Sequence, residues 1–393
     1  MRSYSPVGSA LLIVAAFSSL QFVLAAGPQA RKPLGSRDRV PLQTLIQAVD
    51  AAEPGVASDS NPTWDIHVLK SGSLTGYVPF TIALGGELAA SKSLAMYVRA
   101  ALRHDAPPVE EHSVFREWLA HPGGTSSETN NLVGLSARDM PVGGPAVSMG
   151  GRPAAAAQSS SILALQEKEA KREKAAASNL YAFEEYHVFD GKPGRADEPR
   201  VVQRALALAP GEYDVFVALL DPARMKPGGS ATVLSRTVRV PDFRAEALEL
   251  SSLILVNSLH TLAKPYTFEQ QLEHPYAFGG TEIIPAMSTT FAASDVLSVM
   301  YQICNFRAPQ PRLRVTYDFY HEVDARRRRF NGTAPQELTE ADLPPSPTSE
   351  TQAYMMQSMP LASFRPGQYE LEVTVTDHLA QLTQKATVAF SVR

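Results

Sequence analysis

The sequence predicts an all-β protein built from two tandem immunoglobulin-like β-sandwich domains with long disordered insertions. The first observation is a repeated strand, because the segment 210–221, PGEYDVFVALLD, returns as 366–377, PGQYELEVTVTD. In each copy a Pro-Gly turn precedes a run in which apolar and polar side chains alternate, as in a half-buried antiparallel strand. The inward positions are Tyr213, Val215, Val217 and Leu219 in one copy and Tyr369, Leu371, Val373 and Val375 in the other. A second apolar strand follows each copy, at 232–240 and 385–392, so each copy reads as a hairpin.

Two shorter matches upstream extend the repeat. The segment 185–190, EYHVFD, resembles 319–324, FYHEVD, and 93–101 has the texture of 294–302. Similar segments in a fixed order, with insertions of different length between them, are what two divergent copies of one domain leave behind. The alternative is chance similarity, because Pro-Gly-x-Tyr strands are common in β-sandwiches.

The first 60 residues predict an export signal and a leader. Residues 1–26 carry one early basic residue, an apolar run and small residues near Ala25 and Ala26, as a secretory signal peptide does. The alternative, a membrane anchor, requires about 20 apolar residues, and the continuous run here is shorter. We therefore expect an extracytoplasmic protein, periplasmic or secreted, with no membrane span after cleavage. Residues 27–60 read as a flexible leader in which only Leu42–Val49 suggests a short helix.

The first domain is predicted to span 61–243. Its expected strands are Trp64–Leu69, Gly76–Ala83, Leu94–Leu102, Asn179–Phe189, Val201–Leu208 and the hairpin of the repeat. The segment Val109–Leu119 changes to a helical period, which indicates a short helix that covers part of the sandwich. A low-complexity insertion at 121–178 has too few apolar residues to order itself.

The second domain is predicted to span 247–393. Its expected strands include Leu248–Val256, Asp295–Phe306 and Leu313–Val323, before the second hairpin. A further row that should face a core is Leu313, Val315, Tyr317 and Phe319. In the strand before it, Leu297, Val299, Tyr301 and Ile303 share one side, and Met300, Gln302 and Cys304 share the other. A flexible loop is expected at 326–358, beginning with the arginine run Arg326–Arg329. Such a run either recognises phosphate or an anionic glycan or is a solvated part of the loop.

The segments Val240-Pro241-Asp242-Phe243 and Leu250-Ser251-Ser252-Leu253, together with the Pro-Gly-x-Tyr hairpin, carry a resemblance. Over residues 181–393 the chain resembles uncharacterised secreted proteins of Acidobacteria and the β-domain tails of GWxTD-domain proteins. The Gly-Trp-x-Thr-Asp motif itself is absent from this sequence. The resemblance implies a β-sandwich with no assigned catalytic residues.

Composition and motifs narrow the function classes. A net charge of −4 argues against nucleic-acid binding. The nine histidines show no H-x-x-x-H or H-E-x-x-H pairing, and no nucleotide or hydrolase motif follows a strand, so we assign no catalytic, cofactor-binding or metal residues and no cofactor. The single cysteine, Cys304, is expected to be a buried or half-buried structural thiol rather than a nucleophile. The repeated Tyr-His-x-x-Asp at 186–190 and 320–324 is expected to be architectural, because the His and Asp side chains of a strand point to opposite faces.

These patterns favour a protein that is not an enzyme. The preferred hypothesis is an interaction or scaffold protein that binds an unknown envelope or surface protein. The alternative is a carbohydrate-binding protein of the cell envelope, in which Trp64, Trp118 and the tyrosines stack on sugar rings. A third hypothesis is an enzyme whose carboxylates lie far apart in the sequence.

The repeat also predicts two structural tyrosines. Tyr213 and Tyr369 should each bury the ring and bond a backbone group through the hydroxyl. We expect them to belong to separate cores, so that substitution of one affects only the unfolding of its own domain.

Overall fold

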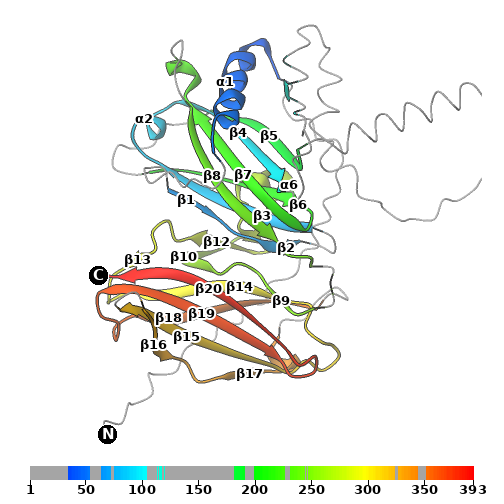
Figure 1. The fold of residues 1–393 in the computed structure, drawn as a ribbon, viewed down its shortest axis with the longest axis vertical. Coiled ribbons are helices and arrows are strands. Elements are labelled where there is room, and N and C mark those ends of the chain that lie inside the picture. Colours follow the sequence, from blue (N-terminus) through cyan, green and yellow to red (C-terminus); the bar gives the residue numbers. More distant parts are fainter. Residues whose placement is uncertain are drawn as a thin grey trace, which may run out of the picture.

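The computed structural model describes residues 34–53, 63–71, 75–103, 113, 115–116, 119, 181–190, 199–225, 231–243, 245, 247–323, 326–343 and 351–393. Within them the chain is an all-β sandwich fold, as the sequence predicts, with only short helices (Figure 1). The expected signal peptide (1–26) and the low-complexity insertion (121–178) lie outside the described residues.

The N-terminal half contains two sheets. The N-terminal inner sheet consists of β1 (Thr63–Ile66), β2 (Leu69–Ser71), β3 (Thr75–Leu84) and β6 (Arg200–Leu208). The second sheet has the order β5 (Phe183–Asp190), β4 (Ser93–Leu102), β7 (Gly211–Leu220) and β8 (Thr232–Val240). We call it the helix-covered sheet. The short helices α2 (Gly86–Ala89) and η3 (Pro222–Arg224) lie in its connections.

The C-terminal half also contains two sheets. The C-terminal inner sheet has the order β11 (Ala277–Phe278), β12 (Thr281–Pro285), β10 (Ile254–Thr261), β14 (Val296–Cys304) and β18 (Gln352–Pro360), and β9 (Glu249–Leu250) pairs with β14. The last sheet has the order β13 (Thr290–Phe291), β20 (Leu382–Val392), β19 (Gly367–Asp377), β15 (Leu313–Val323) and β16 (Arg326–Gly332), and β17 (Gln336–Leu338) pairs with β15. We call it the open sheet. The helices here are α6 (Phe268–Glu273) and η4 (Glu340–Asp342).

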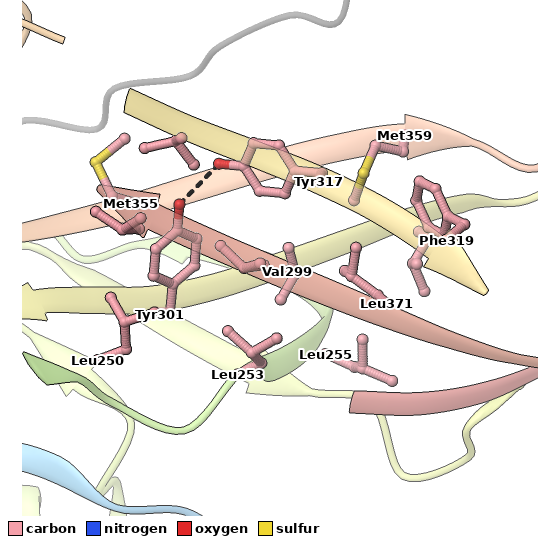
Figure 2. Close-up of a cluster of buried hydrophobic side chains, with 14 of the residues drawn as sticks. Leu250, Leu253, Leu255, Val299, Tyr301, Tyr317, Phe319, Met355, Met359 and Leu371 are labelled. Carbon is pink, nitrogen blue, oxygen red and sulfur yellow. Dashed lines mark hydrogen bonds between the residues drawn. The ribbon is translucent and has the colours of Figure 1, made fainter. Parts of the chain in front are cut away.

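Each half has a core of its own between its two sheets. The three rows predicted to face a core lie in these cores, which confirms those predictions. In β14 it is the side with Leu297, Val299, Tyr301 and Ile303 that lies in the C-terminal core. In the C-terminal core the hydroxyls of Tyr301 and Tyr317 are 2.8 Å apart, so the two rings cross the core and satisfy each other (Figure 2). Burial raises the pKa of Tyr317 to about 12.

The two halves pair their strands in the same way. In the N-terminal half the pairs are β1–β3, β3–β6, β4–β5, β4–β7 and β7–β8. In the C-terminal half the corresponding pairs, in the same chain order, are β10–β14, β14–β18, β15–β16, β15–β19 and β19–β20. By this order β4 corresponds to β15 and β5 to β16. The two upstream sequence matches, which equated 185–190 with 319–324 and 93–101 with 294–302, are therefore wrong by one strand. They compared segments that share only the alternation of a buried strand.

The two repeated tyrosines occupy the same place in each half. Tyr213 and Tyr369 are both 3% exposed. The Tyr213 hydroxyl donates to the carbonyl of Ala209 at 3.0 Å, and the Tyr369 hydroxyl donates to the carbonyl of Arg365 at 2.9 Å. Each acceptor lies four residues upstream of its tyrosine, across the turn that enters the strand. The predicted burial and backbone bond are thus confirmed, and the tyrosines lie in different cores.

The short helix suggested at Leu42–Val49 is present, but the prediction of a flexible leader is wrong for this segment. The chain forms η1 (Ser36–Asp38) and then α1 (Arg39–Asp50), which packs on the outer face of the helix-covered sheet. Leu42, Leu45, Ile46 and Val49, at helical spacing, are at most 3% exposed. The partner face carries Phe216, Ala218 and Leu220 of β7, so this strand is buried on both sides rather than half-buried.

The two inner sheets pack against each other and join the halves. An apolar cluster contains Leu69 of β2 together with Ile254, Val256, Met300 and Met356 of the C-terminal inner sheet. Figure 1 shows the resulting stack, with α1 and the helix-covered sheet at one end and the open sheet at the other.

Polar groups inside this junction are also paired. The side chain of Gln302 accepts from the backbone N–H of Lys70 at 2.7 Å and donates to its carbonyl at 3.3 Å. The Lys70 ammonium donates to Asn305 at 3.0 Å, and Ser252 accepts from the Val68 backbone at 2.8 Å. Gln302 is fully buried, so this bonding fixes the register of one half on the other.

His67 lies at the same junction and is 4% exposed. Its Nδ1 is 2.9 Å from the Tyr276 hydroxyl, and its Nε2 is 3.3 Å from an Asp65 carboxylate oxygen. The carboxylate only accepts, so the neutral tautomer with the proton on Nε2 satisfies both partners. Burial lowers the pKa of His67; Asp65 opposes this shift and Arg236 adds to it.

We expect the junction to weaken in acid. The unfolded chain takes up a proton at His67 near its ordinary pKa of 6.5, whereas the folded chain resists it, so stability falls as the pH drops below that value. The loss is at most about 1.4 kcal/mol per pH unit. Urea unfolding at pH 7.5 and 5.5 measures it. His67→Gln should remove this part of the pH dependence, and His260→Gln, at an exposed position, should retain it. An unchanged pH dependence in His67→Gln would refute the assignment.

Candidate interaction surface

The repeated Tyr-His-x-x-Asp motif does not assemble into an acid–base set. The His187 ring lies against Phe189, with the ring centroids 4.4 Å apart. The Tyr186 hydroxyl donates instead to Asp38 at 3.4 Å. Asp190 accepts from Ser93 at 2.9 Å. Successive residues thus face opposite sides of β5, as the sequence predicts.

The second copy of the motif is dispersed in the same way. The His321 ring stacks on Tyr369, with centroids 4.6 Å apart. The Tyr320 hydroxyl donates to Glu372 at 3.4 Å on the other side of the sheet. Asp324 lies outside the described residues.

Cys304 is fully buried against the N-terminal core, which confirms a buried structural thiol. Within the part of the chain that the structure describes, no group of three or more His, Cys, Asp or Glu side chains is placed to hold a metal ion.

A polar cluster that the sequence did not indicate lies beneath α1. Glu184 accepts from Tyr97 and, at 2.8 Å, from Ser113. Burial, and then the neighbouring Glu184, raises the pKa of Tyr97. Beside it Arg99 donates to Asp50, at the end of α1, at 2.8 Å. Of these bonds, the one from Arg99 to Asp50 joins the sheet directly to the end of α1.

A second unpredicted cluster joins α6 to β12. The His274 ring is 2.6 Å from Glu282 and stacks on Tyr266, with centroids 4.5 Å apart. The Tyr266 hydroxyl donates to the other oxygen of Glu282 at 3.2 Å. All three side chains come from residues 266–282, so the cluster closes a local connection.

The arginine run is not a flexible loop, as predicted for 326–358, but the edge strand β16. Two of its four arginines pair with acidic residues of β15 and β19. Arg327 donates to Glu370 and Glu372, each at 2.7 Å, and its guanidinium lies 3.4 Å from the ring centroid of Tyr320. Arg329 is 2.6 Å from Asp318. β17, η4 and β18 order much of the remaining segment, whereas 344–350 lie outside the described residues.

Arg327 and Arg329 belong to the outer face of the open sheet. Lys385 donates to Glu372 at 2.9 Å on this face, and the hydroxyls of Thr376 and Thr383 are 3.0 Å apart. Burial opposes ionisation of Glu372, but the bonds from Lys385 and Arg327 outweigh it and lower the pKa. The exposed residues of β20 on this face include Thr383, Lys385, Thr387 and Ala389. No described segment packs on them as α1 packs on the equivalent sheet.

Of the aromatic residues proposed for sugar stacking, Trp64 is buried. Trp64 is 6% exposed, packs edge-on against Phe80 at 6.4 Å and lies under the Arg236 guanidinium. Trp118 lies outside the described residues.

Comparisons with known proteins assign no family. No protein-family model and no curated protein matches the chain. Among solved structures, red sea bream transglutaminase shares 8% identity over 85% of this chain, with a TM-score of 0.18. The native conformation of E. coli alpha-2-macroglobulin shares 12% over 84%, with a TM-score of 0.19, and Bacteroides uniformis beta-glucuronidase shares 8% over 81%, also with 0.19. The chain spans 32%, 17% and 26% of these proteins, respectively.

Within the described residues, no helix is long and apolar enough to cross a membrane.

Proposed function

We propose that the protein is a non-catalytic, extracytoplasmic interaction or scaffold protein whose two tandem immunoglobulin-like domains present the outer face of the open sheet to a protein partner. The supporting observation is that the corresponding outer faces of the two halves differ. In the N-terminal half this face is apolar and covered by α1, whereas in the C-terminal half it is polar and uncovered among the described residues. A face that lacks an intramolecular cover is free to receive another molecule.

The immunoglobulin-like class rests on the strand order and on the tyrosines. In each half a sheet with the order β1-β3-β6 or β10-β14-β18 packs on a sheet of the other strands. The tyrosine at the start of β7 or β19 bonds the backbone just upstream, as the tyrosine corner of immunoglobulin-like sandwiches does. The extracytoplasmic location rests on residues 1–26 of the sequence.

The buried junction makes the two domains a stiff pair. Its apolar cluster and the bonds of Gln302 to Lys70 order both inner sheets at once. A stiff pair loses little conformational entropy on binding, which suits a scaffold.

Capture from an envelope extract tests the proposal. The mature protein immobilised as bait should retain a defined partner, identified by mass spectrometry. Thr387→Lys, at an exposed site on the open face, should reduce recovery of that partner at least about tenfold. Thr237→Lys is the matched control, because it makes the same change at an exposed site on the corresponding hairpin of the N-terminal half. Equal recovery with both variants would contradict a role for this face.

The carbohydrate-binding alternative is separated by a glycan array. If the mature protein binds one class of glycan specifically and Thr387→Lys does not, the partner of this face is a sugar rather than a protein. The burial of Trp64 gives this alternative less support.

A further inference from the structure

The four arginines of β16 are divided by the alternation of the strand. Arg327 and Arg329 contact residues on the outer face of the open sheet. Because successive side chains of a strand point to opposite faces, Arg326 and Arg328 are directed to the other side. In the register of the sheet Arg328 lies opposite His321, whose ring stacks on Tyr369 on that same side.

This second pair of arginines has no counter-charge among the described residues. Arg327 and Arg329 form ion pairs with Glu370, Glu372 and Asp318, whereas no described acidic side chain pairs with Arg326 or Arg328. Both are exposed. Arg326 and Arg328 therefore give this edge a local positive charge, although the net charge of the chain is −4.

An aromatic side chain continues the row. The register shifts between Phe319 and Tyr320, which makes Phe330 the extra residue of a bulge. The centroid of its ring is 5.1 Å from that of Phe364 and 5.4 Å from that of Tyr369, yet 39% of the residue is exposed. Arg326, Arg328 and Phe330 thus form a row of two cations and one apolar group along the strand.

The backbone of β16 is also available. β16 ends the strand order of the open sheet, and among the described residues its backbone pairs only with β15. It lies at the side of the C-terminal half that faces away from the N-terminal strands (Figure 1). An edge strand presents N–H and C=O groups that another extended polypeptide can satisfy.

We propose that β16 binds an extended acidic segment of a partner protein, which adds as a strand to the edge of the open sheet. Carboxylates at alternate positions of the segment face Arg326 and Arg328, and an apolar residue two positions further contacts Phe330. Alternate residues of a strand are about 6.7 Å apart, so an acidic residue at every second position matches the two arginines. A second copy of this chain does not fit, because pairing β16 with itself brings arginines against arginines. This inference rests on the proposed role as an interaction protein and names the chemistry of the partner.

A binding assay with the mature protein tests the inference. The probe is a labelled peptide of alternating Thr and Glu that ends in Val, and the comparison probe has Lys in place of Glu. We expect the acidic peptide alone to bind, and to bind less tightly as salt is added. The double variant Arg326→Ser, Arg328→Ser should weaken binding at least about tenfold. The matched control, Arg307→Ser with Arg312→Ser, removes the same charge from exposed positions between β14 and β15, outside β16, and should bind within about threefold of wild type.

Backbone pairing has its own readout. Methylation of alternate peptide nitrogens on the pairing edge should abolish binding, because it removes the N–H donors and adds bulk. Equal binding of the methylated peptide would overturn strand addition. Binding of a sulfated oligosaccharide without binding of the peptide would overturn it in favour of a polyanion. If the acidic peptide does not bind, strand addition is also overturned, and the arginines instead protect the sheet edge against aggregation. These outcomes are independent of the capture experiment with Thr387→Lys, so failure of one proposal is distinguishable from failure of the other.

Discussion

Replacement of either corner tyrosine by alanine should destabilise the protein by about 3–5 kcal/mol, as removal of a large buried aromatic does. Tyr213 and Tyr369 each fill a core position and each satisfy a carbonyl four residues upstream. The alanine leaves a cavity and an unpaired carbonyl at the turn that enters β7 or β19. Urea unfolding followed by fluorescence and circular dichroism measures the loss.

The phenylalanine variants separate the two contributions. Tyr213→Phe and Tyr369→Phe keep the ring and lose only the hydroxyl bond, so each should cost about 1 kcal/mol. The change should be of similar size in the two halves, because each hydroxyl donates to a carbonyl four residues upstream. A loss below about 1 kcal/mol for either alanine variant would contradict the structural role.

The junction modifies the expectation that the domains unfold separately. The cores are distinct, but the buried bonds of Gln302 to Lys70 and the apolar cluster around Met300 join both inner sheets. Unfolding of one half exposes this surface of the other. We therefore expect calorimetry to show coupled transitions that both move when Tyr213 or Tyr369 is replaced, and two wholly independent transitions would show that the junction contributes little.

Leu45→Ala should cost about 2–4 kcal/mol, the second largest effect. Leu45 is fully buried between α1 and the helix-covered sheet. Its truncation leaves a cavity between the helix and the sheet. The same unfolding measurement applies, and loss of the helix should also increase binding of a hydrophobic dye to Phe216 and its neighbours.

Val40→Ala is the matched control for this helix. Val40 lies in the first turn of α1 but is 61% exposed, so its truncation should change stability by no more than about 0.5 kcal/mol. Equal effects of the two substitutions would mean that α1 does not dock as described.

The strands were predictable because their signal is local. Alternation in rows such as Leu313, Val315, Tyr317 and Phe319 depends only on neighbours two residues apart, and all four residues lie in the core. The helix α1 had a local signal too, in the spacing of Leu42, Leu45, Ile46 and Val49. Its docking site, however, is a strand about 170 residues later in the chain.

The arginine strand and the junction were not predictable because their causes are non-local. Four adjacent arginines read as a solvated loop until Asp318, Glu370 and Glu372 are placed beside two of them. Gln302 likewise reads as a solvent-facing residue of β14, yet it is fully buried because the backbone of Lys70 lies against it. The candidate surface thus emerged from pairings between distant strands, which no motif in the sequence records.

Above all, we propose that the outer face of the open sheet, here the open face, receives a protein partner. Site-specific photo-crosslinking in envelope extract tests it most directly, with a photoreactive amino acid at Ala389 on the open face and, separately, at Thr237 on the corresponding hairpin of the N-terminal half. The account predicts a discrete adduct from Ala389, identified as a protein by mass spectrometry, and none from Thr237. An adduct from Thr237 alone, or no adduct from either position, would contradict it.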